Sequence, residues 1–192
     1  MKISSTLLGA GAALAVLACG PALAQEAAPT PAAAAQRPEI KAIGDWSVRC
    51  FPVQSPSPCD MYEELDDKNS HQRVLSVSVA YVPSADRHAI QIVVPLGVSI
   101  PKGLVIQTDN FTSPQLHYRR CDRSGCYVEM MLPNDSLNSL SHSGPEAKIK
   151  IVADSGKPFD LRFSLNGFTA ARDAMAELAK QKAKAPAPAP AK

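Results

Sequence analysis

The sequence predicts a mainly β protein: an antiparallel β-sandwich or barrel of about eight short strands, with one short helix and a C-terminal helix. Three observations support this fold class. Apolar and polar residues alternate through most of the chain between 45 and 165, as they do in strands with one buried face. Prolines stand at the breaks between these segments, and a sustained helical period occurs only near the C-terminus.

The first alternating segment shows the pattern most clearly. Trp46, Val48 and Cys50 lie on one face of the expected strand, and polar residues separate them. The proline-rich residues 51–58 that follow are typical of a loop. Further strands are expected at residues 59–65, 73–82, 89–94, 104–108, 115–121, 126–132, 147–153 and 159–165.

Two helices are expected. Residues 134–140 place Leu137 and Leu140 at i and i+3 behind an N-cap candidate, Asn134, which predicts a short helix. Residues 169–181 carry the longest helical pattern, with an apolar stripe formed by Ala171, Ala174, Met175 and Leu178. We expect this stripe to lie against the sheet.

Residues 1–24 have the organisation of a secretory signal peptide. A basic start precedes an apolar run, and Ala22-Leu23-Ala24 forms an A-x-A cleavage site before Gln25. We therefore expect a periplasmic protein, with secretion or association with the outer membrane as alternatives. The sequence that ends at Cys19 also resembles a lipobox, which would place a lipid anchor on this cysteine. No later stretch has the length of a transmembrane helix.

The rest of the chain is expected to hold one folded domain between two low-complexity segments. Residues 25–39 form an Ala/Pro-rich linker and residues 180–192 a Lys/Ala/Pro tail, and both compositions are typical of disordered chain. Residues 40–179 are long enough for one β-sandwich domain with its own core. The formal net charge of +2 is too small to predict binding to nucleic acid or to an anionic membrane.

Four cysteines remain once Cys19 is cleaved off or acylated, and an even number in an exported chain predicts disulfide bonds. They allow three connectivities, of which we favour the local pairs 50–59 and 121–126. Residues 122–125 are typical of a turn, so 121 and 126 should oppose each other at the neck of a hairpin. The proline-rich loop similarly allows 50 and 59 to meet. The four residues are Cys50, Cys59, Cys121 and Cys126.

The expected hairpin also carries a small basic group, Arg119, Arg120 and Arg123. We expect these arginines to pair with the neighbouring acids Asp122 and Glu129 rather than to form an anion site. Neither face of the hairpin is cleanly apolar, so the sequence leaves open which of its faces meets the core.

Alternative functions for the cysteines and their neighbours fit the sequence less well. A periplasmic thiol-redox or folding factor, the main alternative, needs a Cys-x-x-Cys motif at a helix N-terminus, and the sequence has none. Zinc would find only three ligands at His117, Cys121 and Cys126. The pair Ser141-His142 lacks the Gly-x-Ser-x-Gly motif of a hydrolase. We therefore expect a protein that is not an enzyme and has no catalytic residue, cofactor or metal.

Several short motifs occur in an order that resembles a known family. Together they resemble the invasion-associated locus B family of envelope proteins from Gram-negative, mainly alphaproteobacterial, species. The resemblance covers nearly all of residues 40–179. The motifs are Gly44-Asp-Trp46-x-Val-x-Cys50, Val94-Pro-Leu-Gly97-Val, Gly103-Leu-x-Ile106, Tyr118-x-x-Cys121-x-x-x-Gly-Cys126 and Leu165-x-Gly167-Phe168 before the terminal helix.

This resemblance implies an immunoglobulin-like β-sandwich, a periplasmic or surface location, and a link to host-cell invasion or colonisation in pathogenic members. It carries no catalytic residues to transfer. On this basis the chain is expected to be a virulence-associated binding or structural factor of the cell envelope. Its partner is expected to be an unknown envelope or host protein and not a nucleic acid.

Overall fold

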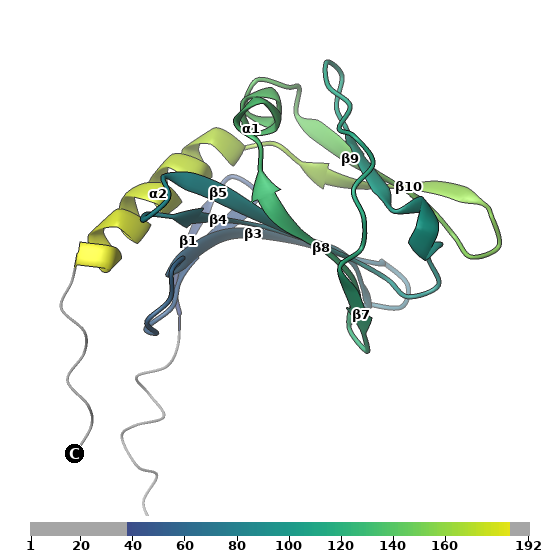
Figure 1. Cartoon of the computed structure of the whole chain (residues 1–192), viewed down its shortest axis with the longest axis horizontal. Coiled ribbons are helices and arrows are strands. Elements are labelled where there is room, and N and C mark those ends of the chain that lie inside the picture. Colours follow the sequence, from purple (N-terminus) through teal and green to yellow (C-terminus); the bar gives the residue numbers. More distant parts are fainter. Residues whose placement is uncertain (1–37, 185–192) are drawn as a thin grey trace, which may run out of the picture.

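Figure 1 shows the computed structural model, which describes residues 38–184. The expected signal peptide (1–24), all but the end of the expected linker (25–39) and the last part of the expected tail (180–192) lie outside the described residues. Secondary structure begins with β1 (Glu39–Ile43) and ends with α2 (Phe168–Lys184), and so reaches slightly beyond 40–179 at both ends.

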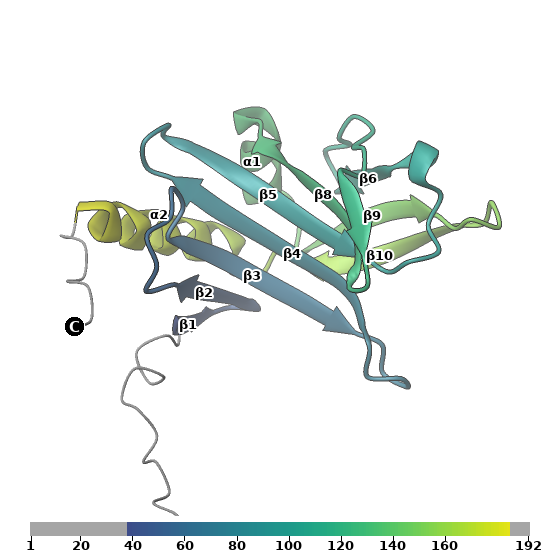
Figure 2. The ribbon, with the colours of Figure 1, turned by 60° about the horizontal axis from the view of Figure 1, so that its bottom comes forward.

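The larger of two antiparallel sheets has seven strands in the order β1-β2-β3-β4-β5-β8-β7. Strands β1 to β5 follow one another along the chain and lie side by side in Figure 2, and β8 then pairs with β5. The remaining bounds in this sheet are β2 (Trp46–Cys50), β3 (Cys59–Asp66), β4 (Arg73–Val82), β5 (Arg87–Val94), β7 (Arg120–Asp122) and β8 (Gly125–Leu132).

A smaller sheet of three strands, in the order β10-β9-β6, covers one face of the large sheet together with the helices (Figure 1). Helix α2 contacts β2, β3 and β4. Within residues 38–184, no helix is both long and apolar enough to cross a membrane. The bounds here are η2 (a 3₁₀ helix, Ile100–Lys102), β6 (Leu104–Gln107), α1 (Asn134–Ser141), β9 (Glu146–Val152) and β10 (Pro158–Ser164).

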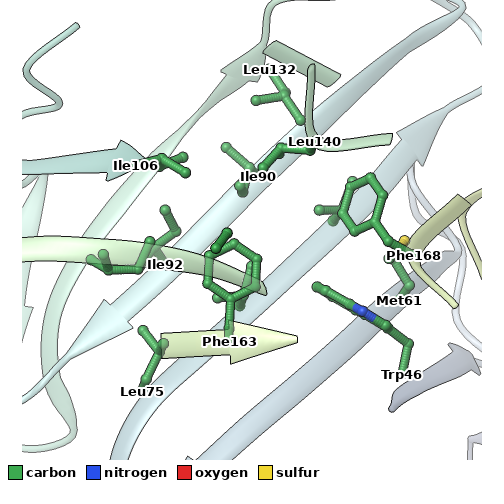
Figure 3. Packing of buried hydrophobic residues seen from close by; sticks show 14 of the residues in the cluster. Trp46, Met61, Leu75, Ile90, Ile92, Ile106, Leu132, Leu140, Phe163 and Phe168 are labelled. Atoms are coloured by element: carbon green, nitrogen blue, oxygen red, sulfur yellow. The ribbon is translucent and has the colours of Figure 1, made fainter. Parts of the chain in front are cut away.

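The core fills the space between the large sheet and its covering elements, and Trp46 joins several of them (Figure 3). Its ring meets Phe163 and Phe168 edge to face, with centroids 6.4 Å and 5.3 Å apart. Its indole N–H donates to the backbone oxygen of Ser164 at 3.1 Å. Burying a side chain of this kind stabilises by roughly 1.5–3 kcal/mol, and each aromatic pair adds about 0.5–1.5 kcal/mol. One side chain thus ties β2 to β10 and α2.

Two glycines let the turn between β1 and β2 touch the entry to α2. Gly44 and Gly167 both have positive φ, at +60° and +79°. A Cβ at Gly44 would lie 2.4 Å from the backbone oxygen of Asn166, so a side chain there would collide with the chain. Asp45 donates its backbone N–H to that same oxygen at 3.2 Å. The Gly-Asp-Trp and Gly-Phe motifs of the sequence are therefore two halves of one contact.

The structure confirms the mainly β, antiparallel fold class with a short helix and a C-terminal helix. The sandwich is unequal, because α2 takes the place of strands over β2, β3 and β4. Strand β1 was not predicted, because it is only five residues long and directly follows the Ala/Pro-rich segment. It lies at the sheet edge, and almost all of its residues are exposed. Pro133 and not Asn134 occupies the N-cap of α1, without a side-chain cap.

The prediction of a strand at residues 115–121 is wrong for most of this range. Only Arg120 and Cys121 of that range belong to a strand, β7. Upstream, Leu116 exchanges backbone hydrogen bonds with Leu104 of β6 at 2.8 Å and 2.9 Å. The segment therefore crosses from the small sheet to the large one, and its alternation reflects no single ladder.

Candidate functional site

Among the described residues, one face of the large sheet is left uncovered (Figure 2). Figure 1 shows that this face is the concave underside of the arched sheet, opposite α2 and the small sheet, and that the β7–β8 hairpin descends at one side of it. We call it the concave face. It is formed by the outward-pointing residues of β2, β3, β4, β5 and β8, which include Arg49, Asp60, Ser78, Gln91 and Glu129.

A hollow of about 490 Å³ lies on the concave face and extends across β3, β4, β5 and β8. Small side chains form its floor: Ser78 and Ala80 of β4 and Ala89 of β5. Phe51, from the β2–β3 loop, borders it on the β3 side, and Arg119, just before β7, borders it on the β8 side. Because small residues lie between larger ones, the face offers a depression that a partner's side chain can enter.

On the β3 side, a fixed ion pair borders the hollow. Asp60 accepts hydrogen bonds from Arg49 Nε at 2.9 Å and from the Ser78 hydroxyl at 2.8 Å. The Arg49 guanidinium also lies over the Tyr62 ring, 3.7 Å from its centroid. Bidentate pairing and ring stacking hold an arginine in one place. This border is therefore rigid, and its charges are already paired.

On the β8 side, the carboxylate of Glu129 borders the hollow, as Asp60 does on the β3 side. It accepts hydrogen bonds from Gln91 at 3.0 Å and from Arg120 at 3.1 Å. Arg120 also lies over the Tyr127 ring at 3.6 Å. Arg119 approaches Glu129 only to 3.7 Å, and its side chain is 72% exposed. An exposed pair of this kind contributes about 0–1 kcal/mol, so Arg119 is held far more loosely than Arg120.

The structure resolves the two faces of the β7–β8 hairpin, which the sequence left open. Cys126 and Val128 point into the core, whereas Arg120 and Tyr127 lie on the concave face. Arg120 also donates to Asp122 at 2.6 Å. This confirms, for Arg119 and Arg120, the expectation that the hairpin arginines pair with neighbouring acids. Among residues 38–184, Arg123 has no such pair.

The four cysteines form two disulfides, each joining directly paired residues. Cys50–Cys59 joins β2 to β3 with Cα atoms 4.1 Å apart, and Cys121–Cys126 joins β7 to β8 with Cα atoms 4.0 Å apart. Cys121 is exposed, and the other three are buried. The first disulfide closes the loop that carries Phe51. The second closes the hairpin that follows Arg119. The backbone of both segments that border the hollow is therefore held in place by a disulfide in or next to it.

The two disulfides lie at diagonal corners of the large sheet. The register places Asp60, next to one disulfide, in the same row as Met131 near the end of β8. Cys126 lies at the start of β8 instead. The hollow lies between these two corners.

Other residues considered in the sequence do not come together as sites. His117 is exposed, and within residues 38–184 no three His, Cys, Asp or Glu side chains are grouped so that they could hold a metal. The hydroxyl of Ser141 donates to the carbonyl of Leu137, and the ring of His142 contacts the carbonyl of Asn138. Both side chains therefore contact backbone carbonyl groups in the last turn of α1.

Apart from the hairpin arginines and Glu129, the residues of the concave face were not considered in the sequence. Each appears there as the polar half of an alternating strand, a pattern that every half-buried strand shows. They converge because β8 pairs with β5, which brings Gln91 opposite Glu129. The run of small residues Ser76, Ser78 and Ala80 on one side of β4 was the local signal that could have marked the hollow.

Comparisons with known proteins place the chain in a family. Over 137 residues it is 27% identical to an invasion protein B homolog of Brucella abortus (strain 2308), which covers 71% of this chain and 78% of that protein. A homolog from Brucella abortus biovar 1 (strain 9-941) gives the same values.

The fold is also similar to the crystal structure of invasion associated protein B from Bartonella henselae. The TM-score is 0.64 at 22% identity, and the match covers 75% of this chain and 99% of that one. A family model described as invasion associated locus B protein matches residues 46–176. Since this match spans more than half of the sequence, the chain belongs to the invasion-associated locus B family.

Proposed function

We propose that this protein is an exported, non-enzymatic binding protein of the cell envelope, and that it binds a protein partner through the concave face. The observation that carries the proposal is the hollow, which is lined on its two sides by Asp60 and Glu129. Each of these carboxylates holds an arginine that is stacked on a tyrosine of the concave face. Arginine, tyrosine and methionine are enriched at protein interfaces relative to other surfaces. Met131, which lines the hollow, is 37% exposed.

The arginines of the face differ in what they offer a partner. Arg49 and Arg120 are each held by a carboxylate and a ring, so binding costs them little further entropy. Immobilising a comparable free side chain costs about 0.5–1.5 kcal/mol. Arg119 is loosely paired and exposed, and therefore available to a carboxylate on the partner.

Export is supported by the N-terminal sequence and by the paired cysteines. Disulfides persist in the periplasm and outside the cell, where no reducing pool removes them. We place the protein in the periplasm or at the cell surface. The relatives from Brucella abortus are named invasion protein B homologs. We therefore extend the proposal to a link with host-cell invasion or colonisation.

A thiol-redox or folding factor is the alternative, and the surroundings of the cysteines argue against it. A redox-active thiol needs access to its substrate and a stabilised thiolate, usually at a helix N-terminus. Here Cys50, Cys59 and Cys126 are 2% exposed or less. Cys121 is exposed, but like the other three it lies in a strand and not at a helix N-terminus. The two disulfides fit a structural role better.

Site-specific photocrosslinking in the native envelope tests the proposal. A benzophenone amino acid replaces Met131 beside the hollow or, as the control, the exposed Asp173 of α2 on the covered side of the sheet. We expect the first position to capture one defined protein that the second does not capture. Capture of the same protein from both positions, or no capture from Met131, would refute the concave face as the binding surface.

A further inference from the structure

The outer edge of β10 carries backbone groups without a strand partner in the described chain. β10 is an outer strand of the small sheet: β9 pairs with one side of it, and no strand within residues 38–184 pairs with the other. Figure 2 shows β10 at the margin of this sheet. Such an edge is a template for pairing with another chain.

The end of this edge shows which residues direct their groups outward. Ser164 donates its backbone N–H to the Glu63 carboxylate at 2.9 Å, and its carbonyl accepts from the Trp46 indole at 3.1 Å. Both groups of Ser164 therefore point away from β9. In an antiparallel pair this orientation recurs at every second residue. Asp160 and Arg162 accordingly also direct their N–H and C=O groups to the open edge.

This open edge is complementary to itself. If two copies of β10 run antiparallel with Leu161 opposite Leu161, then Asp160 of each copy faces Arg162 of the other. The same register aligns the outward backbone groups of these two residues. Opposite charges directly across two strands are favourable. Within one copy, Asp160 pairs with Lys150 at 3.3 Å and Arg162 with Glu146 at 2.8 Å; both side chains remain accessible, at 34% and 60% exposed, and can also reach across the edge.

In this register, the hydrogen-bonded ladder between the two copies cannot extend past the ends of β10. Pro158 of one copy would lie opposite Ser164 of the other. Pro158 has no N–H to donate, and both outward groups of Ser164 are already occupied by Glu63 and Trp46. The ladder is thus limited to the segment centred on Leu161.

We propose that the protein associates with a second copy of itself through β10, so that the two small sheets join across a two-fold axis into one continuous sheet. A ladder this short buries little area, so the dimer is weak and forms in a concentration-dependent way. The concave face lies on the other side of the large sheet and stays open. The dimer therefore presents two copies of it, which raises the avidity for a clustered partner.

Charge reversal tests this register. Protein expressed from the full-length sequence is studied by sedimentation equilibrium as wild type, as Arg162→Asp, as Asp160→Arg, and as an equal mixture of the two variants. Each variant alone places like charges opposite each other, and the mixture places opposite charges there again. We expect each variant alone to self-associate roughly tenfold more weakly or worse, and the mixture to recover the wild-type association.

Lys157→Asp is the matched control, because it changes the net charge as Arg162→Asp does but lies exposed in the turn before β10. It should associate like the wild type, and thermal melts should show that all variants fold. A wild type that stays monomeric at its solubility limit, or a mixture no tighter than the single variants, would overturn the proposal. So would Asp160 and Arg162 amides that become protected from hydrogen exchange only when envelope extract is added, which would assign the edge to a strand of another protein.

Discussion

At the scale of single residues, Glu63 connects the two sheets and carries an unusual charge state. Its side chain projects from β3 into the core, 9% exposed, and accepts the backbone N–H of Ser164 in β10. Burial raises the pKa of Glu63 from 4.5 to about 7; the hydrogen bond from Ser164 lowers it in part, and the nearby Asp45 raises it further. Between about pH 4.5 and about pH 7, the folded protein therefore keeps a proton on Glu63 that the unfolded chain releases.

This pKa predicts a specific dependence of stability on pH. Between about 4.5 and about 7 the folded state binds more protons at Glu63 than the unfolded state, so its contribution to stability falls as the pH rises. Glu63→Gln keeps an oxygen that accepts from Ser164 but cannot ionise. Denaturant melts should show the variant near wild type at pH 5 and more stable by roughly 1–3 kcal/mol at pH 8. Parallel pH profiles for the two proteins would contradict the assignment.

At the scale of elements, the β7–β8 hairpin depends on its disulfide. β7 spans only Arg120–Asp122, at the edge of the large sheet, and so has few backbone hydrogen bonds of its own. The Cys121–Cys126 bond closes it, and Arg73 at the start of β4 donates to the carbonyl of Ser124 at 2.8 Å. These two contacts hold the hairpin beside the concave face.

Loss of this disulfide should lower the stability of the protein, because its role is structural and not that of a redox-active pair. The double variant Cys121→Ser/Cys126→Ser should lose about 2 kcal/mol of unfolding free energy, as chain-entropy estimates give for a loop of this size. Ser124→Ala in the same turn is the control and should stay within about 0.5 kcal/mol of wild type. Alkylation of the native protein should label none of the four cysteines. Rapid labelling of the 121–126 pair under mild reduction would favour the thiol-redox alternative.

The sequence predicted those elements whose partners are local. Alternation located β4 over its whole length, and turn chemistry placed Cys121 opposite Cys126. It did not locate the crossing at Leu116, because an irregular segment that contacts two sheets in turn can alternate like a strand. The concave face escaped prediction for a related reason. Its residues meet through the pairing of β5 with β8, which no local pattern encodes.

At the scale of the whole molecule, all covering elements lie on one side of the large sheet, which leaves its other side open for binding. Both helices and the small sheet cover the same face of the large sheet, so that the core lies on one side and the concave face is left to solvent in the described chain. The two disulfides hold strands together at diagonal corners of the large sheet, and the outer edge of β10 lies away from the concave face. One surface is thus free for a partner while another is free for a second copy.

The most direct test of this account compares the affinity of the captured partner for two Ala→Arg variants. Ala89→Arg fills the floor of the hollow, whereas Ala85→Arg places the same side chain in the exposed β4–β5 turn. Isothermal titration should show binding weakened roughly tenfold or more for the first variant and unchanged for the second, with similar melting temperatures. Equal affinities for both variants and the wild type would contradict binding through the concave face.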